Sequence, residues 1–339
     1  MDPSSNQIDP QRIVCLGGGT GLSALLRGLK RHVGREISDL KAVVTMSDDG
    51  GSSGRLRREL GVLPPGDIRN CLVALADEED CLARLFQYRF ATGEGLSGHS
   101  FGNLFLTALT DITGDFSQAV LMAESILSVR GQILPATLSD VRLAAVGATG
   151  SRYWGESAIS ASAEPLVELT LHPADAPAFG PAVDSIRQAD LIAVGPGSLY
   201  TSIVPNLLLT EVRDAVRASA APVVLVLNLM TQPGETDGMS AVDHLRAIDR
   251  QAGSDLVDMV LFNTTPIPSQ HLEPYREEGS TAVTVDPAAL SECGAQPLGR
   301  DLLADGPLIR HDSDRLGAVF ADLLQQVASR VAPPVEARS

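Results

Sequence analysis

Two glycine-rich turns constrain the fold of this chain more than any other feature. CLGGGTG (15–21) ends the apolar run RIVCL (12–16), and SDDGGSSGRLRR (47–58) follows a second apolar run, LKAVVTM (40–46). Because glycine is costly inside helices and strands, such clusters mark places where a side chain would block a close approach to the backbone. Leu22, Leu25, Leu26 and Leu29 predict a helix from Thr20 to about Arg31. The segment therefore predicts a right-handed β-strand–helix–β-strand unit with a glycine turn after each strand.

The same alternation continues along the chain. Further strands are predicted at residues 191–195, 222–228, 256–263 and 280–286, with helices between them. This pattern is typical of an α/β fold with a doubly wound, Rossmann-like, mostly parallel sheet. Residues 78–127 predict a helical insertion, and 129–171 predict shorter strands, antiparallel, in a small β subdomain. We expect a single domain over residues 11–330, with the insertions around 78–171, between disordered tails at 1–10 and 331–339.

Charge and composition exclude several classes of function. The net charge of −16 over 339 residues argues against binding to nucleic acid or to an anionic membrane surface. The apolar runs are too short for membrane insertion, and the polar N-terminus lacks the pattern of a signal peptide. The four cysteines have neither the count nor the spacing of a disulfide framework or a zinc site. These features predict a cytoplasmic protein.

The first glycine turn is a candidate phosphate site. Backbone N–H groups at the start of a helix favour an anion there, and the helix dipole adds partial positive charge. Leu22 departs from the G-x-G-x-x-G pattern, and the absence of a following G-K-[ST] excludes an ordinary P-loop. Asp48 and Asp49 stand where dinucleotide-binding folds place an acid against a ribose hydroxyl. The alternatives are that they cap the turn before GGSSG, or that they hold Mg²⁺ together with phosphate oxygens.

Other polar turns are predicted at the same edge of the sheet, since loops at the carboxyl ends of parallel strands line one crevice. They are PPGDIRNC (64–71), GHSFGN (98–103), GPGSLYTS (195–202) and NLMTQPGET (228–236). Arginine must supply positive charge to this site, because the chain has only two lysines, and Arg55 adjoins the second glycine turn. Two residues have a structural role as the alternative to ligand binding. His99 is then a histidine of the core, and Arg310 ties the last helix to the sheet.

The predicted nucleotide-binding residues are Gly17, Gly18, Gly19, Thr20, Gly21, Asp48, Asp49, Gly51, Ser52, Ser53, Arg55, Asp67, Arg69, Asn70, His99, Asn103, Gly197, Ser198, Tyr200, Thr201, Asn228, Met230, Thr231 and Arg310. No catalytic residue is assigned, since the chain shows no Ser–His–Asp grouping and no activated nucleophile. No metal is assigned either, apart from Mg²⁺ at Asp48 or Asp49 if the chain uses one.

Taken together, GGGTGLSALLRGLK, VTMSDDGGSSGRLR, PPGDIRN, GHSFGNL, GPGSLYTSIVPNLL, NLMTQPGET and LIRHD resemble the bacterial gluconeogenesis factor family. The resemblance runs from about Arg12 to Ala328. It implies a Rossmann-like fold and binding of a nucleotide sugar, notably UDP-N-acetylglucosamine. It also implies a role in directing carbon toward cell-wall precursors, and in cell shape, during gluconeogenic growth. The related 2-phospho-L-lactate transferases hold a guanosine nucleotide in the same crevice.

Two functions of different classes therefore stand as hypotheses. One is a non-catalytic regulator that binds a nucleotide sugar, with NAD or a GDP-type nucleotide as other possible ligands. The other is a magnesium-dependent transferase of phosphoryl or 2-phospholactyl groups. A homo-oligomer is expected, and the sequence does not identify regulatory protein partners.

Overall fold

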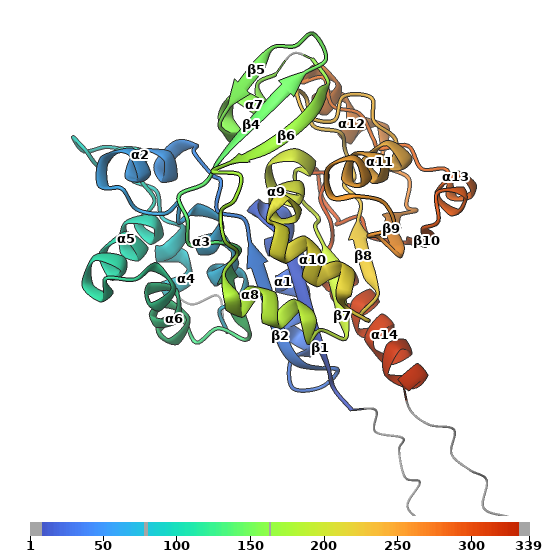
Figure 1. The fold of residues 1–339 in the computed structure, drawn as a ribbon, viewed down its shortest axis with the longest axis horizontal. Coiled ribbons are helices and arrows are strands. Elements are labelled where there is room, and N and C mark those ends of the chain that lie inside the picture. The colour runs from blue at the N-terminus through green and yellow to red at the C-terminus, as the bar shows by residue number, and fades with distance from the viewer. Residues whose placement is uncertain (1–8, 78–80, 163, 332–339) are drawn as a thin grey trace, which may run out of the picture.

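A seven-stranded parallel sheet forms the centre of the computed structural model, which describes residues 9–77, 81–162 and 164–331 (Figure 1). Its strand order is β10-β9-β8-β7-β1-β2-β3, and every neighbouring pair is parallel. The strands are β1 (Gln11–Gly17), β2 (Ile37–Val44), β3 (Gln132–Pro135), β7 (Leu191–Val194), β8 (Val223–Val226), β9 (Met259–Asn263) and β10 (Gln296–Arg300).

Helices cover both faces of this sheet. One layer contains α1 (Gly19–Leu29), the short 3₁₀ helix η1 (Lys30–His32), α3 (Gly66–Leu75) and α14 (Ser313–Val331), and α1 contacts each of the other three. The other contains α8 (Gly180–Arg187), α9 (Val204–Leu208), α10 (Thr210–Ala218) and α11 (Ala241–Ala252). Because both faces are covered, β7 and β8 are continuous apolar runs in which every residue is buried. The predicted doubly wound α/β fold is confirmed.

The predicted insertions are also present. α4 (Cys81–Gln87), α5 (Phe101–Thr113) and α6 (Phe116–Leu127) pack beside α3, and α6 covers the edge strand β3. α2 (Gly51–Leu60) lies next to this group. A three-stranded antiparallel sheet, in the order β5-β4-β6, forms the predicted β subdomain, seen at the top of Figure 1. Its elements are β4 (Arg142–Gly147), β5 (Arg152–Trp154), α7 (Glu156–Ser160) and β6 (Leu166–His172).

Two sequence predictions about strands were wrong, and one strand of the sheet was not predicted. The run at 129–135 was placed in the antiparallel subdomain, but its β3 pairs in parallel with β2. Residues 280–286 are not a sheet strand, because their backbone bonds instead to the loop after β8, through Val283 N–H to Leu229 O. The last sheet strand is β10, whose sequence QPLGR contains a proline and a glycine and so lacks a strand pattern.

The remaining elements are η2 (Leu199–Ile203), α12 (Ser269–Glu277) and α13 (Pro287–Glu292). Most of the two predicted tails, residues 1–8 and 332–339, lie outside the described residues, and Val331 is the last residue of α14.

The contact between α1 and α14 depends on a glycine. A Cβ on Gly28 would lie 1.9 Å from the backbone oxygen of Ser313 and 2.9 Å from the backbone nitrogen of Gly317. Both obstacles are backbone atoms, so the two helices would have to separate to make room for a methyl group. Gly28 therefore allows α14 to pack directly against the helix that follows the first glycine turn.

We predict that Gly28→Ala lowers the free energy of unfolding by about 1–3 kcal/mol, the usual range for overpacking a core. Gly180→Ala is the matched control, since a Cβ at that helical position meets no atom within 4 Å and alanine favours helix. Urea unfolding of the two variants and the wild type measures the difference. Equal stability of all three would contradict the close packing of α1 against α14.

Candidate nucleotide-binding site

The candidate site lies at the switch point of the sheet, where the strand order changes direction. β1 lies between β2, which belongs to the first half of the fold, and β7, which begins the second half. The chain turns away from the sheet in opposite directions after β1 and after β7, which leaves a crevice at their carboxyl ends. A hydrogen bond of 2.8 Å from Gly195 N–H to Leu16 O holds the starts of these two turns together.

A cleft of about 700 Å³ opens at this point. This volume is in the range of about 300–1,000 Å³ that is usual for small-molecule sites. Eleven of the predicted residues line it: Gly18, Gly19, Thr20, Gly21, Asn70, Gly197, Ser198, Asn228, Met230, Thr231 and Arg310. The turns after β1, β7 and β8 and the segment before α14 therefore meet around one space.

The glycines of the first turn are required by close contacts. A Cβ on Gly21 would lie 2.4 Å from the carbonyl oxygen of Pro196, in the turn after β7. A Cβ on Gly18 would lie 2.5 Å from Asp67 Oδ2. Gly19 has φ +64°, a conformation that side chains other than glycine rarely adopt. The N-cap Gly18 has no side chain to cap α1, and the Gly19 N–H bonds to the Asp67 carboxylate. Thr20 and Gly21, whose N–H groups have no intrahelical acceptor, line the cleft.

The turn after β7 is braced by Asn228 from the turn after β8. Asn228 Nδ2 donates to Gly197 O at 2.8 Å, and Gly197 N–H donates to Asn228 Oδ1 at 3.2 Å. Tyr200 and Thr201 do not line the cleft, because both are buried in η2, with Thr201 Oγ1 donating to Glu235 Oε1 at 3.1 Å. Tyr200 and Thr201 therefore stabilise the turn after β7 and do not line the cleft.

A second group of predicted residues forms a buried hydrogen-bonded network beside the cleft. Ser52 Oγ bonds to His99 Nδ1 at 3.0 Å, and Asn103 Nδ2 donates to Ser53 Oγ at 3.3 Å. Arg69 connects this group to the cleft, since its guanidinium donates to Asn103 Oδ1 at 3.1 Å and to Asn70 Oδ1 at 2.7 Å. Apart from Asn70, none of these six lines the cleft, and a ligand role for them stays a prediction.

The remaining predicted residues also lie outside the cleft. Arg55 donates to Ser97 O at 2.8 Å. The carbonyl of Gly17 accepts the N–H of Thr45 at 2.9 Å, and Gly51 begins α2 with φ +44°. Asp48 Oδ1 accepts the N–H of Gly50 at 2.8 Å, which is the turn-capping alternative.

Carboxylates gather on the α3 side of the first glycine turn. Burial, and then repulsion from Asp48, raise the pKa of Asp67 to about 7, against the lowering effect of the Gly19 N–H. Burial, and then repulsion from Asp48 and Asp67, raise the pKa of Glu156 to about 9. Asp49 lies near Glu156, because its Oδ1 accepts the backbone N–H of the next residue, Ser157, at 3.0 Å.

Oxygen donors of this type suit Mg²⁺, and a cation here would offset the repulsion between the carboxylates. Within the described ranges, however, no group of three or more His, Cys, Asp or Glu side chains is arranged to hold a metal ion. Asp48 and Asp49 thus supply suitable chemistry without a complete ligand set.

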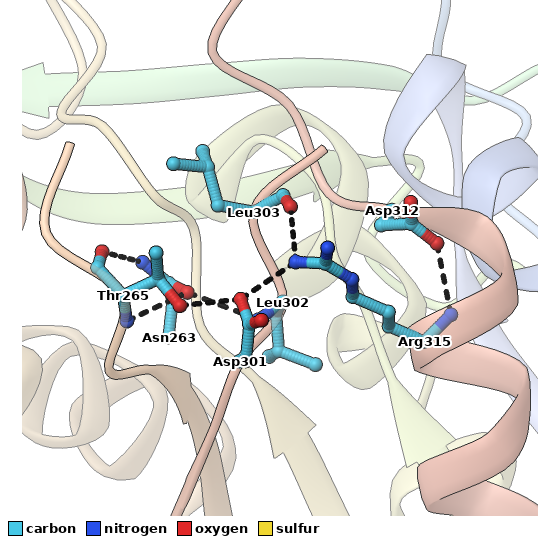
Figure 2. Close-up of polar contacts among 7 residues, drawn as sticks. All are labelled: Asn263, Thr265, Asp301, Leu302, Leu303, Asp312 and Arg315. Atoms are coloured by element: carbon cyan, nitrogen blue, oxygen red, sulfur yellow. Dashed lines mark hydrogen bonds and ion pairs between the residues drawn. The ribbon is translucent and has the colours of Figure 1, made fainter. Parts of the chain in front are cut away.

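The far wall of the cleft comes from the segment before α14, which carries Arg310 and His311. Figure 2 shows how Arg315 anchors this segment. The Nη1 atom of Arg315 lies 2.7 Å from Asp301 Oδ1 and donates to Leu303 O at 2.7 Å, while Asp312 Oδ1 accepts the Arg315 backbone N–H at 2.9 Å. Leu302 N–H donates to Asn263 Oδ1 at 3.0 Å, which ties the segment to the end of β9.

Arg315 therefore connects the last helix to the sheet, a role that the sequence left open for Arg310. The structure records no hydrogen bond or ion pair of the Arg310 side chain with any described residue. His311 Nε2, a buried polar atom of the lining, also has no hydrogen-bond partner there, whereas Arg310 is exposed. Both side chains are available to a ligand.

Comparisons with known proteins agree with this geometry. The sequence profile described as 2-phospho-L-lactate transferase CofD matches residues 13–303. The gluconeogenesis factor of Bacillus subtilis is 43% identical over 316 residues, covering 93% of this chain and 98% of that protein. The chain belongs to the gluconeogenesis factor family.

Solved structures of the family have the same fold. The crystal structure of a UPF0052 family protein from Bacillus halodurans superimposes with a TM-score of 0.88 at 41% sequence identity, covering 92% of this chain and 99% of that one. The gluconeogenesis factor of Listeria monocytogenes is 41% identical over 315 residues, covering 92% of this chain and 95% of that protein. As for membranes, none of the helices in the described ranges is both long enough and apolar enough to span one.

Several residues of this family member were missed by the sequence analysis. Arg27 lines the cleft from the exposed face of α1, where it reads in the sequence as an ordinary solvated arginine. Glu156 comes from the β subdomain, far along the chain from Asp48 and Asp67. Glu235 was quoted within NLMTQPGET but not selected, although its burial next to Thr201 stabilises the turn after β7. No local pattern marks these three positions.

The raised pKa of Asp67 predicts a specific pH dependence. The folded protein disfavours the ionised Asp67 carboxyl. Below about pH 4 the group is protonated in the folded and the unfolded state, and the free energy of unfolding carries no penalty from it. As the pH rises from about 4 to about 7, this penalty grows and the free energy of unfolding falls. Asp67→Asn should therefore gain stability relative to wild type across that interval, by at least about 1.4 kcal/mol, the value of one pKa unit. Denaturant unfolding at a series of pH values measures this difference.

Asp184→Asn, at an exposed position on α8, is the control for loss of a carboxylate and should show no such trend. A stability difference between Asp67→Asn and wild type that stays constant from pH 4 to pH 7 would contradict the electrostatic account of this cluster.

Proposed function

We propose that this gluconeogenesis factor family member binds a nucleotide sugar of the UDP-N-acetylglucosamine type in the cleft at the switch point, and acts as a regulator without turnover. The observation that carries the proposal is the pairing of the first-turn residues Thr20 and Gly21 of α1 with two cations in one cleft. The first turn of α1 lies at one side, and Arg27 and Arg310 line the same space.

A diphosphate is the ligand group that fits this arrangement. Main-chain N–H groups and the dipole of α1 favour negative charge at Thr20 and Gly21. The protein carries a net charge of −16, so an anion needs local positive charge to offset the repulsion. Arg310 is suited to bidentate contact with phosphate oxygens and has no hydrogen-bond or ion-pair partner in the described ranges that would compete for it.

Polar groups elsewhere in the cleft fit the sugar and base. Thr231 and Gln232, in the turn after β8, and Ser280 beside them line the wall away from the glycine turn. Tyr275 adds an aromatic ring to that wall. Hydroxyl, amide and aromatic groups of this kind recognise the hydroxyls and the ring of a nucleotide sugar. In this proposal, occupancy of the cleft reports the supply of cell-wall precursors in the cytoplasm during gluconeogenic growth, and thereby influences cell shape. The names of the relatives as gluconeogenesis factors support that assignment.

Calorimetric titration with UDP-N-acetylglucosamine, GTP and NAD tests the ligand class, and UDP-N-acetylglucosamine should bind most tightly. Arg310→Ala should weaken its binding at least tenfold, about 1.4 kcal/mol, because a charge-assisted contact is lost. The melting temperature should be unchanged, since the Arg310 side chain makes no recorded hydrogen bond or ion pair with the described residues, and its backbone bond to Ala304 is kept in alanine.

Arg187→Ala, which removes an exposed arginine on α8, is the matched control and should bind as wild type does. Titration of Arg55→Ala tests the role that the sequence predicted for that residue. Absence of UDP-N-acetylglucosamine binding at millimolar concentration, or equal losses in Arg310→Ala and Arg187→Ala, would refute the proposal.

The alternative function is a magnesium-dependent transfer of a phosphoryl or 2-phospholactyl group. The cluster of Asp48, Asp67 and Glu156 next to the glycine turn favours it, because a divalent ion would lower the repulsion there and neutralise phosphate oxygens. The match to the transferase profile is a second support. Incubation with UDP-N-acetylglucosamine or GTP in the presence of Mg²⁺, followed by chromatography, tests for turnover. Product that forms with Mg²⁺, disappears with chelator and is absent in Asp67→Asn would establish the transferase.

A further inference from the structure

Beside the nucleotide cleft, the structure contains a second hollow of about 810 Å³ with a lining dominated by cations. The cations are Arg27, Lys30, Arg31, Arg84, Arg130 and Arg310, and Asp77 is the one carboxylate among the described lining residues. We call this hollow the basic cavity. Arg27, Gln87 and Arg310 line both spaces, so the basic cavity adjoins the cleft.

The cations converge from four separate parts of the chain. Arg27, Lys30 and Arg31 follow the i, i+3, i+4 spacing of one helix face at the end of α1 and in η1. Arg84 lies on α4, Arg130 follows α6, and Arg310 precedes α14. A favourable interaction with helix C-termini accounts for the cations on α1 and α4 taken singly. This interaction does not explain why Arg130 and Arg310 line the same cavity.

Carboxylates neutralise only part of this charge. Arg130 pairs with Asp77, and Arg31 pairs with Asp314 at 2.6 Å on an exposed surface. Lys30 Nζ donates to the neutral carbonyl of Ala76 at 2.6 Å. Arg27 and Arg84, like Arg310, make no recorded hydrogen bond or ion pair with the described residues. Among the described residues, therefore, several positive charges of the cavity have no carboxylate partner.

The charges are close enough to disturb one another. Burial lowers the pKa of the Lys30 ammonium first, and repulsion from Arg27 and then from Arg31 lowers it further. Asp77 opposes this effect, and Arg130 adds to it. A bound anion would remove this repulsion, which is the physical reason for a ligand at this place.

We infer that the basic cavity is a second binding site, which takes a small metabolite with two or more phosphate groups while the cleft holds its nucleotide ligand. Phosphate is favoured over carboxylate because five of the six cations are arginines, whose planar guanidinium matches phosphate oxygens in bidentate contacts. The volumes of the two hollows, about 810 and about 700 Å³, each lie in the range of about 300–1,000 Å³ that is usual for a small-molecule pocket. Arg27 and Arg310, which line both, provide a physical connection through which one ligand alters the affinity of the other.

Inorganic pyrophosphate is the probe for this site, with citrate as a carboxylate anion for comparison. Calorimetric titration into the full-length protein is done without and with saturating UDP-N-acetylglucosamine. With saturating UDP-N-acetylglucosamine, one equivalent of pyrophosphate should bind, at least tenfold more tightly than citrate. Without it, at least one equivalent should bind, since the diphosphate position of the cleft is then open to a second. Since the titration without nucleotide sugar does not depend on the proposed function, failure of that function leaves this test intact.

The variant Lys30→Gln/Arg84→Gln removes two cations that line only the basic cavity. It should weaken pyrophosphate binding at least tenfold and leave UDP-N-acetylglucosamine binding within twofold of wild type. Arg187→Gln/Arg213→Gln, on α8 and α10, changes the net charge equally away from both hollows and should bind pyrophosphate as wild type does. A circular dichroism melt of each variant confirms that it folds.

Three results would overturn the inference. They are complete loss of pyrophosphate binding at saturating UDP-N-acetylglucosamine, an equal loss of pyrophosphate binding in the two double variants, and absence of pyrophosphate binding at millimolar concentration. The first would show that the two hollows hold a single ligand. The second would show that only the overall charge of the protein matters.

Discussion

The contact between the first glycine turn and the turn after β7 is the constraint on which the rest of the site depends. A Cβ on Gly21 would lie 2.4 Å from the Pro196 carbonyl oxygen, and one on Gly18 would lie 2.5 Å from Asp67 Oδ2. With side chains at these positions, β1 and β7 could not keep their register and their turns together. Because the turns are so close, the N-terminus of α1 opens directly into the switch-point cleft. Gly28 completes this arrangement by allowing α14 to pack on the same helix, and the segment before α14 then brings Arg310 to the opposite wall.

Charge is distributed unevenly around this constraint. Asp48, Asp67 and Glu156 lie on the α3 side of the glycine turn, where burial and mutual repulsion raise the pKa values of Asp67 and Glu156. Arginines collect on the side of the cleft that borders the basic cavity. A phosphate over the glycine turn would thus lie between a group of carboxylates and a group of cations. Protonation of Asp67 near neutral pH is one way to lower the repulsion, and a divalent cation is another. The two proposed functions differ in which of these the protein uses.

Much of the fold was predictable from sequence because its signals are local. The apolar strands before each glycine turn and the leucine spacing of α1 give the first unit, and the same alternation extends it to a doubly wound sheet. The failures have physical causes. STAVTVD (280–286) has the composition of a strand, yet its backbone partners lie in the loop after β8. β10 contains Pro297 and Gly299 and lies at the edge of the sheet, where such residues are tolerated.

The candidate site was predictable only in part. Glycine-rich and polar turns after apolar strands are visible in the sequence, so the turns after β1, β7 and β8 were predicted to share one crevice, and residues of all three line the cleft. The division between the cleft and the buried network around His99 and Asn103 depends on how α2, α3 and α5 pack, which no short motif encodes. The basic cavity is a product of tertiary structure alone. Arg27, Arg84 and Arg130 are isolated arginines in the sequence and become neighbours only when four parts of the chain meet.

A crystal structure of the protein with UDP-N-acetylglucosamine tests the central claim most directly. The account predicts the diphosphate over the N–H groups of Thr20 and Gly21, with the Arg310 guanidinium on its oxygens and the sugar or base along the turn after β8. Density for the nucleotide sugar over Asp48, Ser52 and His99, with Arg310 free, would contradict it.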